Sequence, residues 1–421
     1  MAAVSFRTTA LAAFGVWDTL VAVVVGGCVL FILFPFVLAA IQRLRIVFVR
    51  DPVPESLRRS SPDAPESSRH ASLAASLERI RRRYRVPALA AALIRDGDLA
   101  ALKAVGVRRA GSDEPIGADD RFHLGSCTKA MTSTVCARLV ERDQLHWDTT
   151  IEQVFPDLSP ELHPDYRGVT LEQLLTHRSG LKEGFTFSMS IWPEVWKLAG
   201  PLDAQRRDLI RLVLRDPPSY KAGAEYSYSN CGYAIAGAMA ERVTGRVWEE
   251  LMRELLFEPL GMTTAGFGAP GDAGADPQPW GHQLRFWTGR WTSVPPGTLA
   301  DNPAVIGPAG NVHCSLADWA KFAALHLGAL AEPRSILSPE MLNWLHTPRF
   351  GGDYAFGWTV AERDWAGGPA LTHAGSNTLW FAVIWLAPRR RLGLLAATNL
   401  GTSMAFSACD AAIGELMNLA E

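Results

Sequence analysis

Lysine is scarce in this chain of 421 residues. The sequence has 41 basic residues but only six lysines, so arginine supplies the positive charge at most positions. Arginine stays protonated in proteins, whereas lysine can release its proton and act as a base. A lysine within a motif of this chain is therefore a stronger indication of chemistry than it would be in a lysine-rich protein.

Metal-binding and disulfide patterns are absent as well. The six cysteines are scattered and form no C-x-x-C pair, and the ten histidines show no H-x-x-x-H spacing. These absences exclude the common zinc motifs and a disulfide framework. We predict that the protein uses no metal and no other cofactor.

The chain also lacks an excess of charge of either sign. Its formal net charge is −2, with 20% charged and 48% hydrophobic residues. A nucleic-acid-binding surface normally carries an excess of basic residues, so we do not expect nucleic acid as a partner. The composition is globular, and the length suffices for one large domain or two ordinary ones.

One segment near the N-terminus contains no charge. Residues 19–42 are uncharged and mostly aliphatic; as a helix, residues 20–41 would span about 33 Å, enough for the hydrocarbon core of a bilayer. The stretch is too long and begins too late for a typical signal peptide, although residues 37–39 resemble a cleavage site. We predict an N-terminal tail over 1–18, an uncleaved single-pass anchor in membrane lipid over 19–42, and a flexible linker over 43–70.

The side of the membrane on which the following domain lies stays open. Arg43, Arg45 and Arg50 follow the apolar span, and only Arg7 precedes it. The positive-inside rule then favours a cytoplasmic domain, but three arginines after so short a tail are a weak signal.

In the remaining chain, residues 71–421, the helical spacing of Leu73, Leu77, Ile80 and Tyr84 predicts a first helix. Strand patterns follow on both sides of a helical middle. Residues 88–107 predict two strands around the tight turn Asp96-Gly97. Helical spacing dominates residues 126–260, and residues 264–312 predict long loops. Further strands are expected at 357–361, 370–373, 379–386 and 392–398, with a hairpin turn at 388–391 and a closing helix over 403–419. We predict an α+β fold in which both ends complete an antiparallel sheet, flanked by helices and interrupted by an all-helical region.

Ser126 and Lys129 lie three residues apart where a helical pattern begins, in Phe122-His-Leu-Gly-Ser-Cys-Thr-Lys129. Three residues make almost one helical turn, so the hydroxyl and the amine face the same way. A serine is a weak nucleophile until a neighbour takes its proton, which a desolvated lysine can do. The spacing alone is a weak signal, because short motifs also occur by chance.

Tyr228 and Asn230 precede an apolar helix and are two residues apart. In an extended turn both side chains can point into one cleft. Beside a lysine ammonium we expect a lowered pKa for Tyr228, so that its phenol can move protons. Asn230 could hold a substrate carbonyl or the lysine. The alternative interpretation is a helix start capped by Asn or Ser.

The segment 371–377, Leu-Thr-His-Ala-Gly-Ser-Asn, ends a predicted strand. Gly375 would let a substrate backbone lie close to the strand. The backbone N–H of Ser376 could pair with that of Ser126 as an oxyanion hole. His373 could donate a hydrogen bond to the substrate or steer protons, and a histidine that only stabilises a turn is an equal alternative. His177, in the segment 174–181, is expected to anchor a turn.

Together these segments resemble the serine β-lactamase and penicillin-binding-protein superfamily, in particular its class C β-lactamase-related branch, which includes D-stereospecific peptidases and esterases. The resemblance covers residues 71–421 and also includes the stretches 174–181 and 307–318. It implies an antiparallel sheet flanked by helices beside an all-helical region. It further implies the following roles: Ser126 as nucleophile, Lys129 and Tyr228 as the proton-transfer pair, Asn230 as the group that orients the substrate amide, and the N–H groups of Ser126 and Ser376 as the oxyanion hole.

His373-Ala-Gly375 departs from the β-lactamase pattern, in which a lysine at the first position helps to bind a substrate carboxylate. An ordinary histidine is mostly neutral at pH 7. We therefore expect weak turnover of β-lactams and favour small ester or peptide substrates. The alternative is a catalytically silent, membrane-tethered module that binds peptides or acyl compounds.

Two other motifs carry no function. The G-x-G-x-x-G match at 266–271 contains Pro270 and opens no predicted helix, so it does not indicate nucleotide binding. The segment 401–405 imitates a nucleophile elbow, but that fold needs a later histidine and none follows His373.

Overall fold

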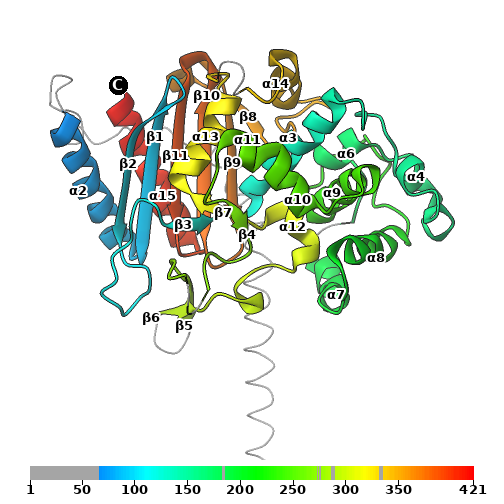
Figure 1. The fold of residues 1–421 in the computed structure, drawn as a ribbon, viewed down its shortest axis with the longest axis horizontal. Helices are drawn as coiled ribbons and strands as arrows, with labels where there is room; N and C mark the ends of the chain where they lie inside the picture. Colours follow the sequence, from blue (N-terminus) through cyan, green and yellow to red (C-terminus); the bar gives the residue numbers. More distant parts are fainter. Residues whose placement is uncertain (1–65, 183–184, 273, 275, 286–289, 331–334) are drawn as a thin grey trace, which may run out of the picture. The chain divides into compact units, whose positions relative to one another are not determined.

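The computed structural model describes residues 66–182, 185–272, 274, 276–285, 290–330 and 335–421 (Figure 1). The predicted tail, the membrane span over 19–42 and most of the linker lie outside these residues. Within the described part of the chain, no helix combines the length and the apolar character needed to cross a membrane. The sheet, the helices around it and the candidate site all belong to the compact unit of residues 60–183 and 191–421.

Helix α2 (Glu66–Tyr84) begins inside the predicted linker. The apolar residues Leu73 and Leu77 of this helix are buried, as their helical spacing predicts.

Six strands form one antiparallel sheet in the order β2-β1-β11-β10-β9-β8. Their bounds are β1 (Ala88–Arg95), β2 (Asp98–Gly106), β8 (Thr359–Arg363), β9 (Gly368–Ser376), β10 (Phe381–Ala387) and β11 (Leu392–Thr398). The N-terminal strand β1 pairs with the C-terminal strand β11, with Ala92 opposite Leu395. The two ends of the domain thus meet in the middle of one sheet, as the sequence predicts.

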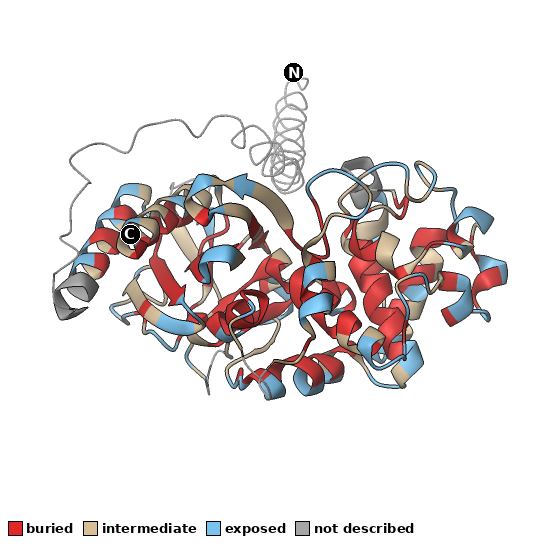
Figure 2. Cartoon of the chain, turned by 90° about the horizontal axis from the view of Figure 1, so that it is seen from above, coloured by how far each residue is buried: buried red, intermediate tan, exposed pale blue. Residues whose placement is uncertain are grey.

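Burial explains why the central strands are continuous apolar runs. Every residue of β11 and all but the last residue of β1 are buried. A strand covered on both faces needs apolar residues at every position. Helix α15 (Ser403–Ala420) packs against α2 and both central strands, which α13 (Leu316–His326) also contacts. Figure 2 shows the burial in red along the strands and the adjoining helices.

The turns of the sheet follow their sequence signals closely. Asp96 and Gly97 both have positive φ, 54° and 92°, as a two-residue hairpin turn requires. Strand β8 begins at Thr359, two residues later than predicted. Gly357 has a φ of 85°, and a Cβ there would lie 2.5 Å from Ala130 Cα. This glycine turns the chain tightly against α3 before the strand starts.

An all-helical region separates the two parts of the sheet. Its α-helices are α3 (Thr128–Glu141), α4 (Ile151–Val154), α5 (Pro164–Arg167), α6 (Leu171–Leu175), α7 (Phe185–Val195), α8 (Leu202–Leu214), α9 (Asn230–Thr244), α10 (Trp248–Met252) and α11 (Glu258–Leu260). Helix α9 lies at its centre and contacts α3, α6, α8 and the short helix α12 (Gly307–Gly310). Its alanines and glycines let these neighbours approach its backbone closely.

The prediction of long loops over 264–312 is only partly right. The segment contains the short strands β4 (Gly266–Phe267), β5 (Gly281–Arg285) and β6 (Arg290–Val294), followed by β7 (Val312–Ser315). Strands β5 and β6 form a hairpin, and β7 pairs with β4 and with β3 (Arg121–His123). Strands of two to five residues are too short to show a readable alternation of apolar residues. Strand β3 directly precedes the turn that contains Ser126.

Candidate active site

Ser126 lies at a turn between a strand and a helix. Strand β3 ends at His123, residues 125–127 form a 3₁₀ turn, and α3 follows at once. Gly125 has a φ of 51°, a left-handed conformation that glycine adopts without strain. The turn leaves Ser126 half-buried on the first turn of the helical segment that carries Lys129.

Lys129 is completely buried, and its amine contacts three oxygens. The Nζ atom lies 3.1 Å from Ser126 Oγ, 2.8 Å from Asn230 Oδ1 and 2.7 Å from the carbonyl oxygen of Ala309. It also lies 4.7 Å from the ring centroid of Tyr228. The structure therefore brings together Ser126, Lys129, Tyr228 and Asn230, which come from two separate segments of the sequence.

The pKa of Tyr228 shifts opposite to the predicted direction. Burial raises the pKa of Tyr228 well above its ordinary value, and a side-chain hydrogen bond with Ser126 offsets this only in part. The lysine lies over the face of the ring. The expectation of a lowered pKa was wrong because desolvation of the phenolate dominates, and the neighbouring Tyr226 and Tyr233 raise the pKa further. Tyr228 is a neutral phenol at pH 7.

His177 fixes the segment that carries Tyr228. Its carbonyl oxygen accepts from the Ser227 N–H at 2.9 Å, and its Nδ1 accepts from the Ser229 N–H at 3.0 Å. The His177 ring lies 4.3 Å from the ring of Tyr228. Burial holds the pKa of His177 well below its usual value, so the imidazole is neutral and can accept. The predicted anchoring role is confirmed, and the anchored turn is the one that presents Tyr228.

Strand β9 lies against the Ser126 turn, backbone to backbone. A Cβ on Gly375 would lie 2.5 Å from the Ser126 nitrogen, and a Cβ on Gly125 would overlap the nitrogen of Ser376. A side chain at 375 would thus collide with the Ser126 turn of the chain itself. The same contact brings the Ser126 and Ser376 backbones together.

His373 is buried on β9, and each of its two ring nitrogens has a polar neighbour. Its Nδ1 lies 2.7 Å from the Ala374 carbonyl oxygen, and its Nε2 lies 3.4 Å from the Tyr354 hydroxyl. Burial, assisted by the charge of Lys129, lowers the pKa of His373 to about 3. The imidazole is therefore neutral at pH 7, and its position offers no fixed positive charge.

Two contacts of the site were not predicted. The third acceptor of Lys129 is a backbone carbonyl, that of Ala309, and backbone atoms leave no residue-specific signal in a sequence. Tyr354 follows two glycines and carries no motif of its own. Among the described residues, His, Cys, Asp and Glu side chains do not gather in groups of three that could hold a metal ion.

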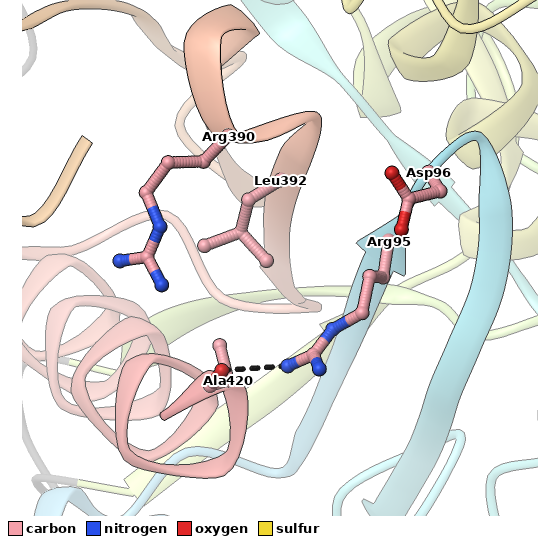
Figure 3. Close-up of a pocket in the computed structure, with 5 residues that line it drawn as sticks. All are labelled: Arg95, Asp96, Arg390, Leu392 and Ala420. Carbon is pink, nitrogen blue, oxygen red and sulfur yellow. Dashed lines mark hydrogen bonds between the residues drawn. The ribbon is translucent and has the colours of Figure 1, made fainter. Parts of the chain in front are cut away.

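The small pocket in Figure 3 is separate from these residues. Arg95, Asp96, Arg390, Leu392 and Ala420 line it, and Arg95 donates a 2.6 Å hydrogen bond to the Ala420 carbonyl oxygen. It lies where the β1–β2 and β10–β11 turns meet the end of α15. None of the site residues described above reaches it.

The family model described as beta-lactamase matches residues 73–417. The chain belongs to the beta-lactamase family. Penicillin-binding protein 4 of Amycolatopsis lactamdurans is 28% identical over 360 residues, which cover 80% of this chain and 87% of the relative. This family member thus matches that relative over most of both chains.

Two further proteins resemble this chain, one in part of its sequence and one in its fold. Lovastatin esterase of Penicillium rubens is 32% identical over 181 residues, which are 39% of this chain and 44% of the esterase. This family member thus spans less than half of that relative. The structure of D-alanine carboxypeptidase AmpC from Burkholderia cenocepacia superposes with a TM-score of 0.64 at 20% identity, covering 83% of this chain and 99% of that one. At this identity the likeness shows the fold alone.

Proposed function

We propose that this beta-lactamase family member is a serine hydrolase that cleaves ester or amide bonds through an acyl-enzyme at Ser126. The contact that carries the proposal is Lys129 Nζ, 3.1 Å from Ser126 Oγ in a buried setting. A buried amine beside a hydroxyl is the arrangement that activates a serine without an imidazole. Relatives named as a penicillin-binding protein and an esterase support amide and ester substrates.

Lys129 Nζ donates hydrogen bonds to three oxygens. The Ala309 carbonyl and Asn230 Oδ1 can only accept hydrogen bonds, so they take two N–H groups. The third bond runs from Nζ to Ser126 Oγ, at 3.1 Å. Once the amine has given up this proton, the Ser126 hydroxyl can donate to its lone pair instead. In this state the lysine is already aligned to receive the serine proton. Arginine at this position would keep its own proton and could not act as the base.

The reaction then proceeds in two halves. Ser126 Oγ attacks the substrate carbonyl carbon as its proton passes to Lys129. The bond to the leaving alcohol or amine breaks, and the leaving atom takes the proton of the neutral Tyr228 phenol. The Lys129 ammonium, which holds the proton from Ser126, then returns a proton to Tyr228. Water attacks the acyl group along the same path in reverse, which releases the acid and restores the Ser126 hydroxyl.

The remaining residues hold the substrate. Because Asn230 Oδ1 accepts from Lys129, its NH₂ group is the part directed to a substrate carbonyl. The backbone N–H groups of Ser126 and Ser376 bind the developing oxyanion, and the close contact at Gly375 supports this pairing. The neutral His373 adds a hydrogen-bonding group but no charge, so esters and peptides are favoured over carboxylate-bearing β-lactams.

Covalent labelling tests the proposal. A fluorescent fluorophosphonate should label the wild type, and Ser126→Ala and Lys129→Arg should not be labelled, although Lys129→Arg retains the positive charge. Hydrolysis of a p-nitrophenyl ester should follow the same order. Ligand binding by the wild type without labelling or turnover would instead support the silent peptide-binding module.

Attachment to a membrane is a further part of the proposal and rests on the sequence of residues 19–42 alone. The test compares the sedimentation of the protein with that of a variant from which residues 1–42 are deleted. We expect the first to sediment with membranes and the variant to stay in the soluble fraction. Recovery of both proteins in the soluble fraction would contradict the anchor.

A further inference from the structure

Asp301 lies between the two backbone segments that form the proposed oxyanion hole. On one side, its carboxylate oxygens lie 2.9 and 3.0 Å from His123 Nε2. The other ring nitrogen of His123, Nδ1, accepts a 3.1 Å hydrogen bond from the Gly125 N–H. Because Nδ1 accepts, Nε2 carries the proton and donates it to Asp301. A continuous path thus joins Asp301 to the residue before Ser126.

On its other side, Asp301 binds the turn that follows Ser376. Asn377 Nδ2 donates to Asp301 Oδ1 at 3.1 Å, and Asn377 Oδ1 accepts from the N–H groups of Leu379 and Trp380, both at 3.2 Å. The Ser376 hydroxyl donates to the Trp380 carbonyl oxygen at 2.6 Å and closes the same turn. The carboxylate therefore reaches the end of β9 through a second side chain.

The network is buried and its geometry is specific. The side chain of His123 is fully buried and that of Asp301 is 7% exposed. The Asn302 N–H is a further donor to Asp301 Oδ1, at 2.7 Å. A carboxylate with three donors from three directions is well compensated in a buried site, and removal of the carboxylate leaves these donors unpaired.

We propose that Asp301 is a positioning residue that sets the relative placement of the Ser126 and Ser376 N–H groups, acting through His123 and Asn377. The proposal rests on the proposed function, because the two N–H groups matter only if an oxyanion forms between them. Asp301 itself contacts none of the reacting atoms. Its effect is to tie the nucleophile turn to the end of β9, so that both donors face one point when the substrate carbonyl becomes an oxyanion.

Two substitutions of Asp301 are compared with a buried carboxylate outside the network. Asp301→Ala removes all three bonds, and Asp301→Asn keeps one acceptor oxygen for either His123 or Asn377. Asp318, buried on α13 and bonded to Thr264 and Lys321, provides the control Asp318→Asn. Misplaced donors lower kcat but leave ground-state binding largely intact. We expect Asp301→Ala to lose about 10- to 100-fold in kcat, with KM within about threefold, and Asp301→Asn to fall between it and the wild type.

A second pair of variants separates the two bonds of His123. In His123→Asn the side-chain oxygen can replace Nδ1 and accept from Gly125, but the amide is too short to reach Asp301. In His123→Gln the terminal NH₂ can replace Nε2 and donate to Asp301, but the acceptor for Gly125 is lost. If the path is continuous, both variants lose kcat to a similar degree. If His123 only supports the local turn, His123→Asn keeps wild-type kcat and the proposal is overturned.

Thermal midpoints and fluorophosphonate labelling rates are measured on the same proteins. The expected result is that Asp318→Asn loses thermal stability but keeps wild-type kcat, whereas the Asp301 variants lose kcat. An equal loss of kcat in all three would make Asp301 a purely structural residue, and normal kcat in Asp301→Ala would also overturn the proposal. If Asp301→Ala does not fold, the kcat values of His123→Asn and His123→Gln test the proposal. If the wild type is neither labelled nor active, the proposed hydrolase function is wrong. If the wild type and Asp301→Ala are both fully active, only the positioning role of Asp301 is wrong.

Discussion

Gly237 on α9 lets Pro308 lie directly against the helix backbone. A Cβ at this position would come within 2.5 Å of Pro308 Cγ and 2.9 Å of its Cβ. Pro308 precedes Ala309, whose carbonyl oxygen binds Lys129, and the Pro308 carbonyl accepts from Thr132 on α3 at 2.8 Å. One missing methyl group in the helical region therefore sets the position of an acceptor in the candidate site.

Replacement of Gly237 by alanine should disturb both stability and activity. The added methyl group must push the 307–310 segment away from α9, and overpacking of this kind costs about 1–3 kcal/mol of unfolding free energy. The Ala309 carbonyl should then bind Lys129 less well, and kcat for an ester should fall. Chemical unfolding and ester kinetics on one preparation measure both effects.

Gly414 provides the control for this substitution. It lies within α15, and a Cβ there would meet nothing within 4 Å. Because alanine favours the helix over glycine, Gly414→Ala should raise the unfolding free energy by about 0.5–1 kcal/mol and leave kcat unchanged. Wild-type stability and activity in Gly237→Ala would show that α12 is not held against α9 as described.

His177 should matter to catalysis through its acceptor nitrogen. His177→Ala leaves the buried Ser229 N–H without its partner, which costs about 1–3 kcal/mol, and frees the segment that presents Tyr228. His177→Asn can replace Nδ1 with its side-chain oxygen, and asparagine tolerates the φ of 59° at this position. We expect His177→Asn to retain most of the wild-type kcat. In His177→Ala we expect kcat to fall by about tenfold or more, because Tyr228 is no longer held in place. Equal activity of the two variants would contradict this role.

The sequence predicts the sheet well because its signals are local. Asp96-Gly97 selects its own turn, and the apolar run over 392–398 coincides with β11 because a doubly covered strand has apolar residues throughout. The sequence also predicts that Ser126 and Lys129 share one face, since their spacing in a helix fixes this.

The sequence does not predict the features of the site that depend on contacts between distant segments. The raised pKa of Tyr228 results from burial that only the packed site creates. Asp301 reaches His123 across 178 residues of chain, from a segment whose glycines and prolines suggest nothing but a loop. Side chains that act by positioning others carry no spacing rule, so only the folded chain identifies them.

The stability of the protein should decrease as the pH falls below about 6.5. Burial lowers the pKa of His373, and likewise of His346, to about 3, whereas an unfolded histidine titrates near 6.5. Between these values the unfolded chain binds the extra proton and the folded chain does not, so the free energy of unfolding falls with decreasing pH.

The slope of this decrease is measurable by urea unfolding between pH 4.5 and 8. Each such histidine contributes up to about 1.4 kcal/mol per pH unit. His346→Gln removes one titrating group outside the candidate site and should make the slope shallower than in the wild type. A slope that is unchanged in this variant would mean that His346 is able to take up a proton in the folded protein.

His373→Lys tests how position 373 selects substrates. The neutral imidazole gives the wild type no cation for a substrate carboxylate, and its pKa near 3 means that mild acid does not create one. A lysine there introduces an ammonium group, although burial opposes its charge. We expect kcat/KM for a carboxylate-bearing β-lactam to rise by about tenfold, while kcat/KM for an uncharged ester stays equal or falls, since one compensated charge contact is worth about 1–2 kcal/mol. His373→Gln, which keeps a neutral hydrogen-bonding group, controls for the loss of the imidazole and should improve neither reaction. Efficient β-lactam hydrolysis by the wild type itself would show that another group binds the carboxylate and that position 373 does not determine the substrate class.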